Sequence, residues 1–97
     1  MDAAEKDLAG EIVHRDIYVG NLDYGTTERE LEEFFSEFGS VRRVRIPTDI
    51  YTGWGRGFAF VDMPDMTEAR LAMETLNGEL FRGRALRLDW SRSSDSS

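Results

Sequence analysis

Hydrophobic positions in the central part of the chain follow two different periods. In four stretches apolar and polar side chains alternate, as in β-strands with one covered face. In two longer stretches apolar residues recur every three or four positions, which is typical of amphipathic helices. The alternating stretches are residues 16–22, 41–46, 57–63 and 85–90, and the helical stretches are residues 28–38 and 66–76. The pattern predicts strand, helix, strand, strand, helix and strand, in that order.

Each predicted helix has an apolar stripe and recognisable end signals. Thr27 followed by Glu30 fits a capping box, and Asp65 is a candidate N-cap three residues before Glu68. Gly39 is the predicted stop of the first helix. The apolar stripes consist of Leu31, Phe34, Phe35 and Phe38 in the first helix, and of Ala69, Leu71, Ala72, Met73 and Leu76 in the second.

This order of elements predicts an α+β fold. Two helices can cover only one face of a four-stranded sheet, so we expect a ferredoxin-like β-α-β-β-α-β two-layer sandwich, with two helices on one face of an antiparallel sheet. In the third strand the aliphatic Ala59 and Val61 must point toward the helices. Phe58 and Phe60 have the opposite parity, so they are expected on the uncovered face beside Tyr18 of the first strand.

The two ends of the chain differ in composition from its centre. Residues 1–15 are expected to form a flexible acidic leader, residues 16–90 the folded domain, and residues 91–97 a flexible tail that contains serine and arginine. No apolar run approaches the roughly 18 residues of a membrane span, and the first residues lack the basic and apolar regions of a secretory signal. We therefore expect an intracellular protein that does not contact a membrane.

The composition excludes several kinds of chemistry. The 97 residues include no cysteine and a single histidine, His14, which excludes disulfides, thiol catalysis and any thiolate or multi-histidine metal site. The glycine-rich residues 53–57 lack the spacing of a dinucleotide-binding loop and the lysine of a phosphate-binding loop. No nucleophile is accompanied by a base. We therefore expect a protein that is not an enzyme and that uses no cofactor or metal.

Charge is distributed unevenly along the chain. The net charge is -7, from 12 basic and 19 acidic residues, which by itself argues against a nucleic-acid ligand. However, residues 28–37 carry five glutamates and one arginine, whereas residues 42–56 carry four arginines and one aspartate. A ligand responds to the local field of the surface that it meets. The sequence thus predicts an acidic surface on the helices and leader, and a basic surface on the sheet and its loop.

Three aromatic residues on one uncovered sheet face suggest a ligand. A single phenylalanine in a strand belongs to a core more often than to a binding site. Tyr18, Phe58 and Phe60 together would form an apolar patch that is costly to expose to water, and such patches typically mark a binding surface. Flat rings suit unstacked nucleobases and nearby arginines suit phosphates, so the pattern favours single-stranded nucleic acid.

Two motifs resemble those of a known family. Residues 56–63, Arg-Gly-Phe-Ala-Phe-Val-Asp-Met, are similar to the octamer of the RNA recognition motif (RRM) family, K/R-G-F/Y-G/A-F-V-x-F/Y. Residues 17–22, Ile-Tyr-Val-Gly-Asn-Leu, resemble the family's hexamer on the first strand. The order of elements agrees too, so the resemblance covers residues 16–90. Met63 replaces the final aromatic residue; because its parity faces the core, we expect a change in packing and an intact binding face.

The resemblance implies roles for the matching residues. Tyr18 would stack on one base and Phe60 on its neighbour, Phe58 would pack against the sugars between them, and Arg56 would pair with a phosphate. Asn21 would contact a base edge, although its position is explained equally well by a turn. Four charged side chains are expected to point outward beside the rings: Arg43, Arg45, Arg87 and Asp89. Trp54, in the loop between the second and third strands, is expected to stack on a further base or on a protein partner.

The resemblance implies a monomer that binds single-stranded RNA in mRNA processing or RNA metabolism. Single-stranded DNA is a second candidate ligand, because its bases stack equally well. The alternative is a protein-binding member of the family that holds a partner on the acidic helical face or through the loop aromatics. The intact sheet aromatics favour RNA. The Ser-Arg-Ser-Ser run near the end of the chain favours a nuclear location.

Overall fold

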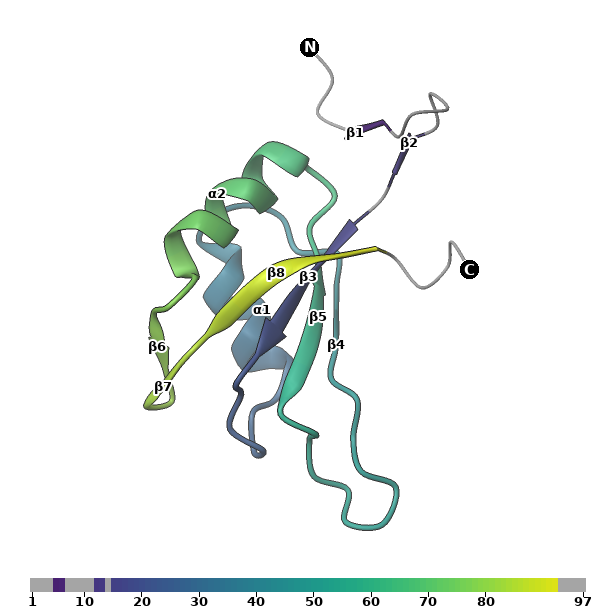
Figure 1. Ribbon diagram of the computed structural model, residues 1–97, viewed down its shortest axis with the longest axis vertical. Coiled ribbons are helices and arrows are strands. Elements are labelled where there is room, and N and C mark those ends of the chain that lie inside the picture. The colour runs from purple at the N-terminus through teal and green to yellow at the C-terminus, as the bar shows by residue number, and fades with distance from the viewer. Residues whose placement is uncertain (1–4, 7–11, 14, 93–97) are drawn as a thin grey trace.

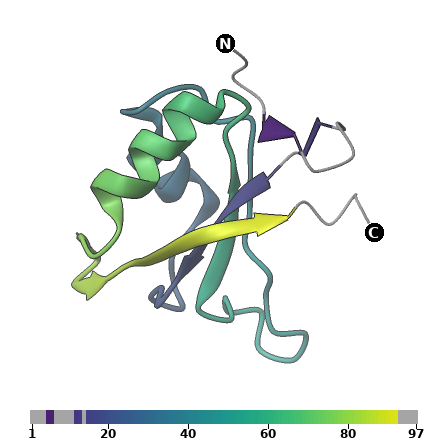
Figure 2. The ribbon, with the colours of Figure 1, turned by 45° about the horizontal axis from the view of Figure 1, so that its top comes forward.

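The computed structural model describes residues 5–6, 12–13 and 15–92 of the chain. Its main sheet has the strand order β4-β5-β3-β8, and all neighbouring strands are antiparallel. Both helices lie on one face of this sheet (Figure 1), and in the turned view of Figure 2 no described element covers the other face. The elements are β3 (Arg15–Gly20), α1 (Glu28–Ser36), β4 (Arg43–Arg45), β5 (Phe58–Asp62), α2 (Met66–Leu76) and β8 (Arg87–Arg92). The predicted ferredoxin-like α+β fold is confirmed.

Two short hairpins accompany the main sheet. They are formed by β1 (Glu5–Lys6) with β2 (Ile12–Val13), and by β6 (Leu80–Phe81) with β7 (Arg84–Ala85). The hydrophobic pattern does not predict either hairpin, because strands of two residues are too short to show alternation. The turn of the second hairpin has positive φ at Arg82 (52°) and Gly83 (83°), as a type I′ turn requires.

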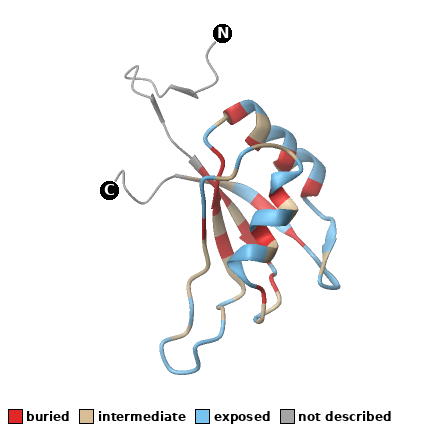
Figure 3. Ribbon diagram, turned by 180° about the vertical axis from the view of Figure 1, so that it is seen from behind, coloured by how far each residue is buried: buried red, intermediate tan, exposed pale blue. Residues whose placement is uncertain are grey.

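The core lies between the sheet and the two helices (Figure 3). Ala59 and Val61 of β5 are fully buried there, whereas Phe58 and Phe60 alternate with them and are only half-buried. This confirms the predicted parity of β5. The fully buried apolar side chains of the two layers are Ile17, Val19, Leu31, Phe35, Ala59, Val61, Met63, Ala69 and Ala72.

Both helices begin at the predicted caps. The hydroxyl of Thr27 accepts the backbone N–H of Glu30 at 3.2 Å, and the carboxylate of Glu30 accepts the backbone N–H of Thr27 at 2.9 Å, which completes the capping box. The Asp65 carboxylate accepts the N–H groups of Thr67 and Glu68 at 2.8 and 3.1 Å. Neither described helix combines the length and the apolar character that crossing a membrane would need.

Several element ends differ from the prediction. α1 ends at Ser36 instead of reaching Gly39, because the chain turns at Glu37, the C-cap. β4 comprises only three of the six predicted residues. Arg15 of β3 pairs with Arg92 of β8, so the ladder extends one residue into the predicted leader and two residues into the predicted tail. The rest of the tail, and all of the leader except residues 5–6, 12–13 and 15, lies outside the described residues.

Leu71 does not belong to the core side of α2, contrary to the prediction. Its side chain is 52% exposed. Ala69 and Ala72 occupy the buried side of the helix together with Met66 and Leu76. Leu71 lies next to Ala72 in sequence, and adjacent helical residues are rotated by about 100° from each other. The prediction was wrong because several apolar residues in succession cannot all face one side.

Thr27→Ala should lower the free energy of unfolding by about 1 kcal/mol, because the first turn of α1 then loses its side-chain acceptor. Urea unfolding followed by circular dichroism measures this difference. Thr75→Ala is the matched control, since Thr75 lies on the exposed side near the end of α2. Equal losses in the two variants would contradict a specific contribution from the cap.

Candidate nucleic-acid interface

Three aromatic rings lie together on the uncovered sheet face. Tyr18 of β3 is directly opposite Phe60 of β5, and Gly20 is opposite Phe58. The ring centroids of Tyr18 and Phe58 are 6.0 Å apart at an interplanar angle of 27°. Phe60 meets both rings edge-on, with centroids 6.0 Å from Tyr18 and 5.8 Å from Phe58. The three side chains are half-buried, so they support one another and still present surface to solvent.

Gly20 makes room for the ring of Tyr18. A Cβ atom at position 20 would lie 2.9 Å from both Cε2 and the hydroxyl oxygen of Tyr18, closer than such atoms approach in proteins. The tyrosine ring therefore rests against the backbone of Gly20. A larger residue at this position would displace the ring from its place beside Phe58.

Arginines lie beside the rings. The guanidinium carbon of Arg45 is 4.9 Å from the centroid of the Phe60 ring, a cation–π contact. Arg43, at the same edge of the sheet, is exposed, and so is Arg87 on β8 at the opposite edge. The rings are therefore bordered by positive charge along both edge strands.

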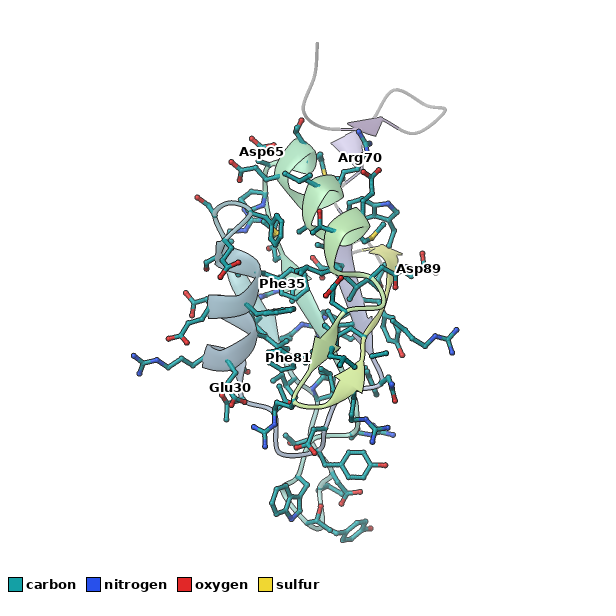
Figure 4. All side chains as sticks on the ribbon, turned by 90° about the vertical axis from the view of Figure 1, so that its left-hand side faces the viewer. Glu30, Phe35, Asp65, Arg70, Phe81 and Asp89 are labelled. Carbon is teal, nitrogen blue, oxygen red and sulfur yellow. The ribbon has the colours of Figure 1, made fainter. Side chains whose placement is uncertain are left out.

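Acidic side chains gather mainly on the helical side. Glu28, Glu32 and Glu33 of α1 are all exposed. Figure 4 shows Glu30 on the α1 side of the molecule and Asp89 on the β8 side. Asp89 is exposed and its carboxylate accepts its neighbour's backbone N–H at 2.8 Å. Among the described residues, the exposed glutamates of α1 therefore lie on the other side of the sheet from the arginines that border the rings, and Asp89 is an acceptor next to those arginines. The predicted acidic leader lies largely outside the described residues.

Asn21 is held by the chain itself. It has a positive φ of 62°, and its amide nitrogen donates to the carbonyl of Ala85 at 2.7 Å. Arg84 donates to the Asn21 side-chain oxygen at 2.6 Å and to its backbone carbonyl at 3.1 Å. These bonds give Asn21 a structural role that connects the end of β3 to the β6–β7 hairpin. Its contact with a base edge stays a prediction.

Trp54 and Arg56 belong to the loop between β4 and β5. Asp49 orders this loop by accepting the backbone N–H groups of Thr52 and Tyr51 at 3.0 and 2.8 Å. These two bonds, and then the charge of Arg56, lower the pKa of Asp49. Trp54 is 60% exposed and Arg56 is also exposed. Both side chains lie at the end of the sheet and not on its face.

Sequence reasoning missed Arg82, which ties the chain between β3 and α1 to the β6–β7 turn. Its guanidinium donates to both carboxylate oxygens of Glu30 at 2.9 and 3.0 Å, and lies 3.2 Å from the carboxylate of Asp23. The available signal is the pair Arg82-Gly83, which suits a hairpin turn. The partners of Arg82 are more than 50 residues away in sequence, so local patterns do not identify them.

A four-stranded antiparallel sheet with helices on one face, and aromatic rings bordered by arginines on the other, defines a class of domain suited to nucleic acid. The family model of the RNA recognition motif matches residues 17–87. The chain therefore belongs to the RNA recognition motif family.

Individual relatives agree with this assignment. The chain is 46% identical over 76 residues to RbpE of Nostoc sp., a protein named for RNA binding, and the match covers 78% of this chain and 77% of RbpE. It is 43% identical over 86 residues to the human cleavage stimulation factor subunit 2 tau variant, covering 89% of this chain and 14% of that protein. A solved Sxl-lethal protein/RNA complex is similar with a TM-score of 0.76 and 31% identity, covering 84% of this chain and 48% of the solved chain.

Glu30→Gln should destabilise the protein at neutral pH but not in acid. The backbone N–H of Thr27, and also Arg82, lower the pKa of Glu30 below its ordinary value of 4.5. A carboxylate whose pKa is lowered on folding stabilises the fold at pH values above its pKa in the unfolded chain. This stabilisation is lost as the pH falls through its pKa in the folded state. Urea unfolding at neutral pH and at about pH 3 measures the free energy of unfolding of Glu30→Gln and of wild type. The difference between the two proteins should be smaller in acid.

Glu32→Gln is the control for this comparison, because Glu32 is exposed on the same helix and its side chain takes no part in these bonds. If Glu30→Gln lowered the free energy of unfolding by the same amount at both pH values, this would contradict the role given to the Glu30 carboxylate.

Proposed function

We propose that this protein binds single-stranded RNA by stacking bases on Tyr18 and Phe60, with Phe58 against the sugars between them. The observation that supports this best is the cluster of three mutually braced rings on the uncovered sheet face. Each stacked base typically contributes about 1–3 kcal/mol of binding free energy. Because the rings already hold one another in place, little side-chain freedom remains to be lost on binding.

The charged side chains support contacts that stacking alone does not provide. Arg43, Arg45, Arg56 and Arg87 are candidates for phosphate contacts, since all four border the rings or the adjoining loop. Asp89 can accept a hydrogen bond from a base edge. Phosphate contacts position the strand, whereas base-edge contacts carry sequence preference.

The relatives support a role in RNA metabolism. One of them is a subunit of a cleavage stimulation factor, which suits mRNA processing, while RbpE comes from a cyanobacterium. Because these organisms include both bacteria and mammals, the relatives do not select between a nuclear and a non-nuclear location. The nuclear location and the role in mRNA processing stay predictions.

The double variant Phe58→Ala/Phe60→Ala should lose about 1–3 kcal/mol of binding free energy for the base stacked on Phe60, and in addition the contact of Phe58 with the sugars. The domain should remain folded, because both side chains point away from the helices. Fluorescence anisotropy with labelled pools of random-sequence RNA and of random-sequence single-stranded DNA measures the loss for each ligand. Circular dichroism measures the fold.

Leu71→Ala is the control, because Leu71 is an exposed apolar residue on the helical side. It should bind RNA as the wild type does. Unchanged RNA binding by the folded double variant would exclude the stacking proposal. Loss of the fold in the double variant would instead mean that the rings belong to the core.

Binding should depend only weakly on salt. For a single strand, the slope of log K against log salt concentration becomes more negative by about 0.7 for each phosphate that the protein neutralises. Four arginines near the rings allow a slope no steeper than about -3, and the net charge of -7 opposes long-range attraction. RNA titrations at a series of KCl concentrations should therefore give modest affinity and a shallow dependence of log K on log salt concentration. A slope steeper than about -4, as for six phosphates, would contradict this charge arrangement.

A further inference from the structure

The turn that follows β3 has an unusual backbone conformation. Among the described residues, only Asn21 and Arg82 combine a side chain with a positive φ, which is 62° at Asn21. Asparagine tolerates this left-handed conformation better than most residues, whereas glycine adopts it freely. The next residue, Leu22, donates its backbone N–H to the carbonyl of Gly57 at 2.9 Å, just before β5 begins. The turn at Asn21 therefore connects the ends of the two strands that carry the rings.

Arg84 of the β6–β7 hairpin supports this turn. Its Nη2 donates to Oδ1 of Asn21 at 2.6 Å, and its Nε donates to the backbone carbonyl of the same residue at 3.1 Å. The amide nitrogen of Asn21 donates in turn to the carbonyl of Ala85 at 2.7 Å. A planar guanidinium is suited to such a two-point contact, because its donors have a fixed geometry. Three hydrogen bonds from one hairpin therefore hold the conformation of one residue.

The supported turn adjoins the backbone on which the Tyr18 ring rests. Gly20 directly precedes Asn21, and a Cβ atom at Gly20 would lie 2.9 Å from Cε2 of Tyr18. Gly20 is also opposite Phe58 in the pairing of β3 with β5. A different backbone conformation at Asn21 would therefore move the surface beneath the Tyr18 ring and change its alignment with Phe58.

The alternative role for these two polar side chains is direct contact with RNA. Arg84 is exposed, so its charge could meet a phosphate, but two of its nitrogens are already bonded to Asn21. The Asn21 amide likewise has both its nitrogen and its oxygen engaged within the chain. A phosphate or a base edge would have to displace these bonds. The arrangement therefore favours a role within the chain for both residues.

We infer that Arg84 is a positioning residue for RNA binding, which acts through the turn at Asn21 on the support of the Tyr18 ring. Neither side chain contacts RNA, and the role of Asn21 is its positive φ instead of the base contact predicted from the family. The inference rests on the proposed function, because the position of the ring matters only if a base stacks on it. Support from outside the ring cluster keeps the rings in the orientation that binds, so less freedom is lost when a base arrives.

Two substitutions of Asn21 separate its conformation from any contact of its amide. Asn21→Gly removes the amide but adopts a positive φ freely, so it should bind a random-sequence octamer RNA pool within about 2-fold of wild type. Asn21→Ala removes the amide and disfavours the positive φ, so fewer molecules have the binding conformation and affinity should fall by about 5- to 30-fold. Fluorescence anisotropy measures both affinities. An equal loss in the two variants would mean that the amide contacts RNA, which would overturn the inference.

Salt dependence distinguishes positioning by Arg84 from a phosphate contact. Arg84→Gln should weaken binding of the same pool without changing the slope of log K against log salt concentration, because no phosphate contact is lost. Arg87→Gln is the matched comparison, since Arg87 is an exposed arginine beside the rings and a proposed phosphate contact. Its slope should become shallower by about 0.7. A slope that became equally shallow for Arg84→Gln would overturn the inference.

The two residues should also be coupled. Arg84→Gln should weaken binding less in the Asn21→Gly background than in the wild type, because glycine needs less support for the positive φ. In ¹⁵N-labelled protein without RNA, Arg84→Gln should shift the amide signals of Tyr18 and Gly20 but not that of Leu71 on α2. Equal losses in both backgrounds would overturn the inference.

The wild-type protein separates this inference from the proposed function. Binding by the wild type, together with unchanged binding by Arg84→Gln and Asn21→Ala, would overturn the positioning role and leave the sheet proposal intact. Absence of binding by the wild type would overturn both. Circular dichroism checks the fold of each variant, and if Arg84→Gln did not fold, the comparison of Asn21→Gly with Asn21→Ala would still decide the role of the turn.

Discussion

The half-covered sheet is the constraint on which the other features depend. Two helices bury one face only, so strict alternation in β5 sends Ala59 and Val61 into the core and Phe58 and Phe60 to the opposite side. A slip of one residue in the pairing with β3 would exchange the two sets and place both phenylalanines under the helices. The core and the ring cluster are therefore specified by the same strand and the same register, and a shift of that register would disrupt both.

Exposed rings are costly, and the structure limits that cost by packing them against each other. Edge-on contacts put the positive ring edge of one aromatic against the negative face of another, an arrangement favoured by about 0.5–1.5 kcal/mol for each pair. Arg45 covers part of the Phe60 ring in the same way that a base would, through its flat guanidinium. A base that stacks on Phe60 must therefore displace Arg45 or share the ring with it. Displaced from the ring, the guanidinium would be close to the phosphates of the same strand.

Local sequence signals were sufficient for the fold and for the ring cluster, because capping boxes and alternation involve neighbours in the chain. Thr27 with Glu30, and Phe58 with Phe60, are such cases. Contacts between residues that are distant in the sequence could not be predicted from local signals. Arg42, the residue before β4, pairs with the buried Asp62 of β5 at 2.9 Å, and nothing near either residue in the sequence indicates the other. Asn21 was predicted from the family as a base contact, whereas its bonds to Arg84 and Ala85 depend on a hairpin that the pattern does not show. The structural bonds of Asn21 and its predicted contact therefore compete for the same amide.

The opposing charges of the two faces determine which interactions can select a ligand. The acidic helices would repel a polyanion at long range, while salt at physiological concentration screens charges beyond about 8 Å. Attraction then comes from the arginines only when the strand is already near the sheet. At that distance the free energy depends on stacking and on hydrogen bonds, which require unpaired and accessible bases. A duplex keeps its bases stacked on each other and would meet the repulsion without gaining this compensation. If the protein binds nucleic acid as proposed, the charge pattern that argues against a nucleic-acid ligand would therefore favour single strands over duplexes.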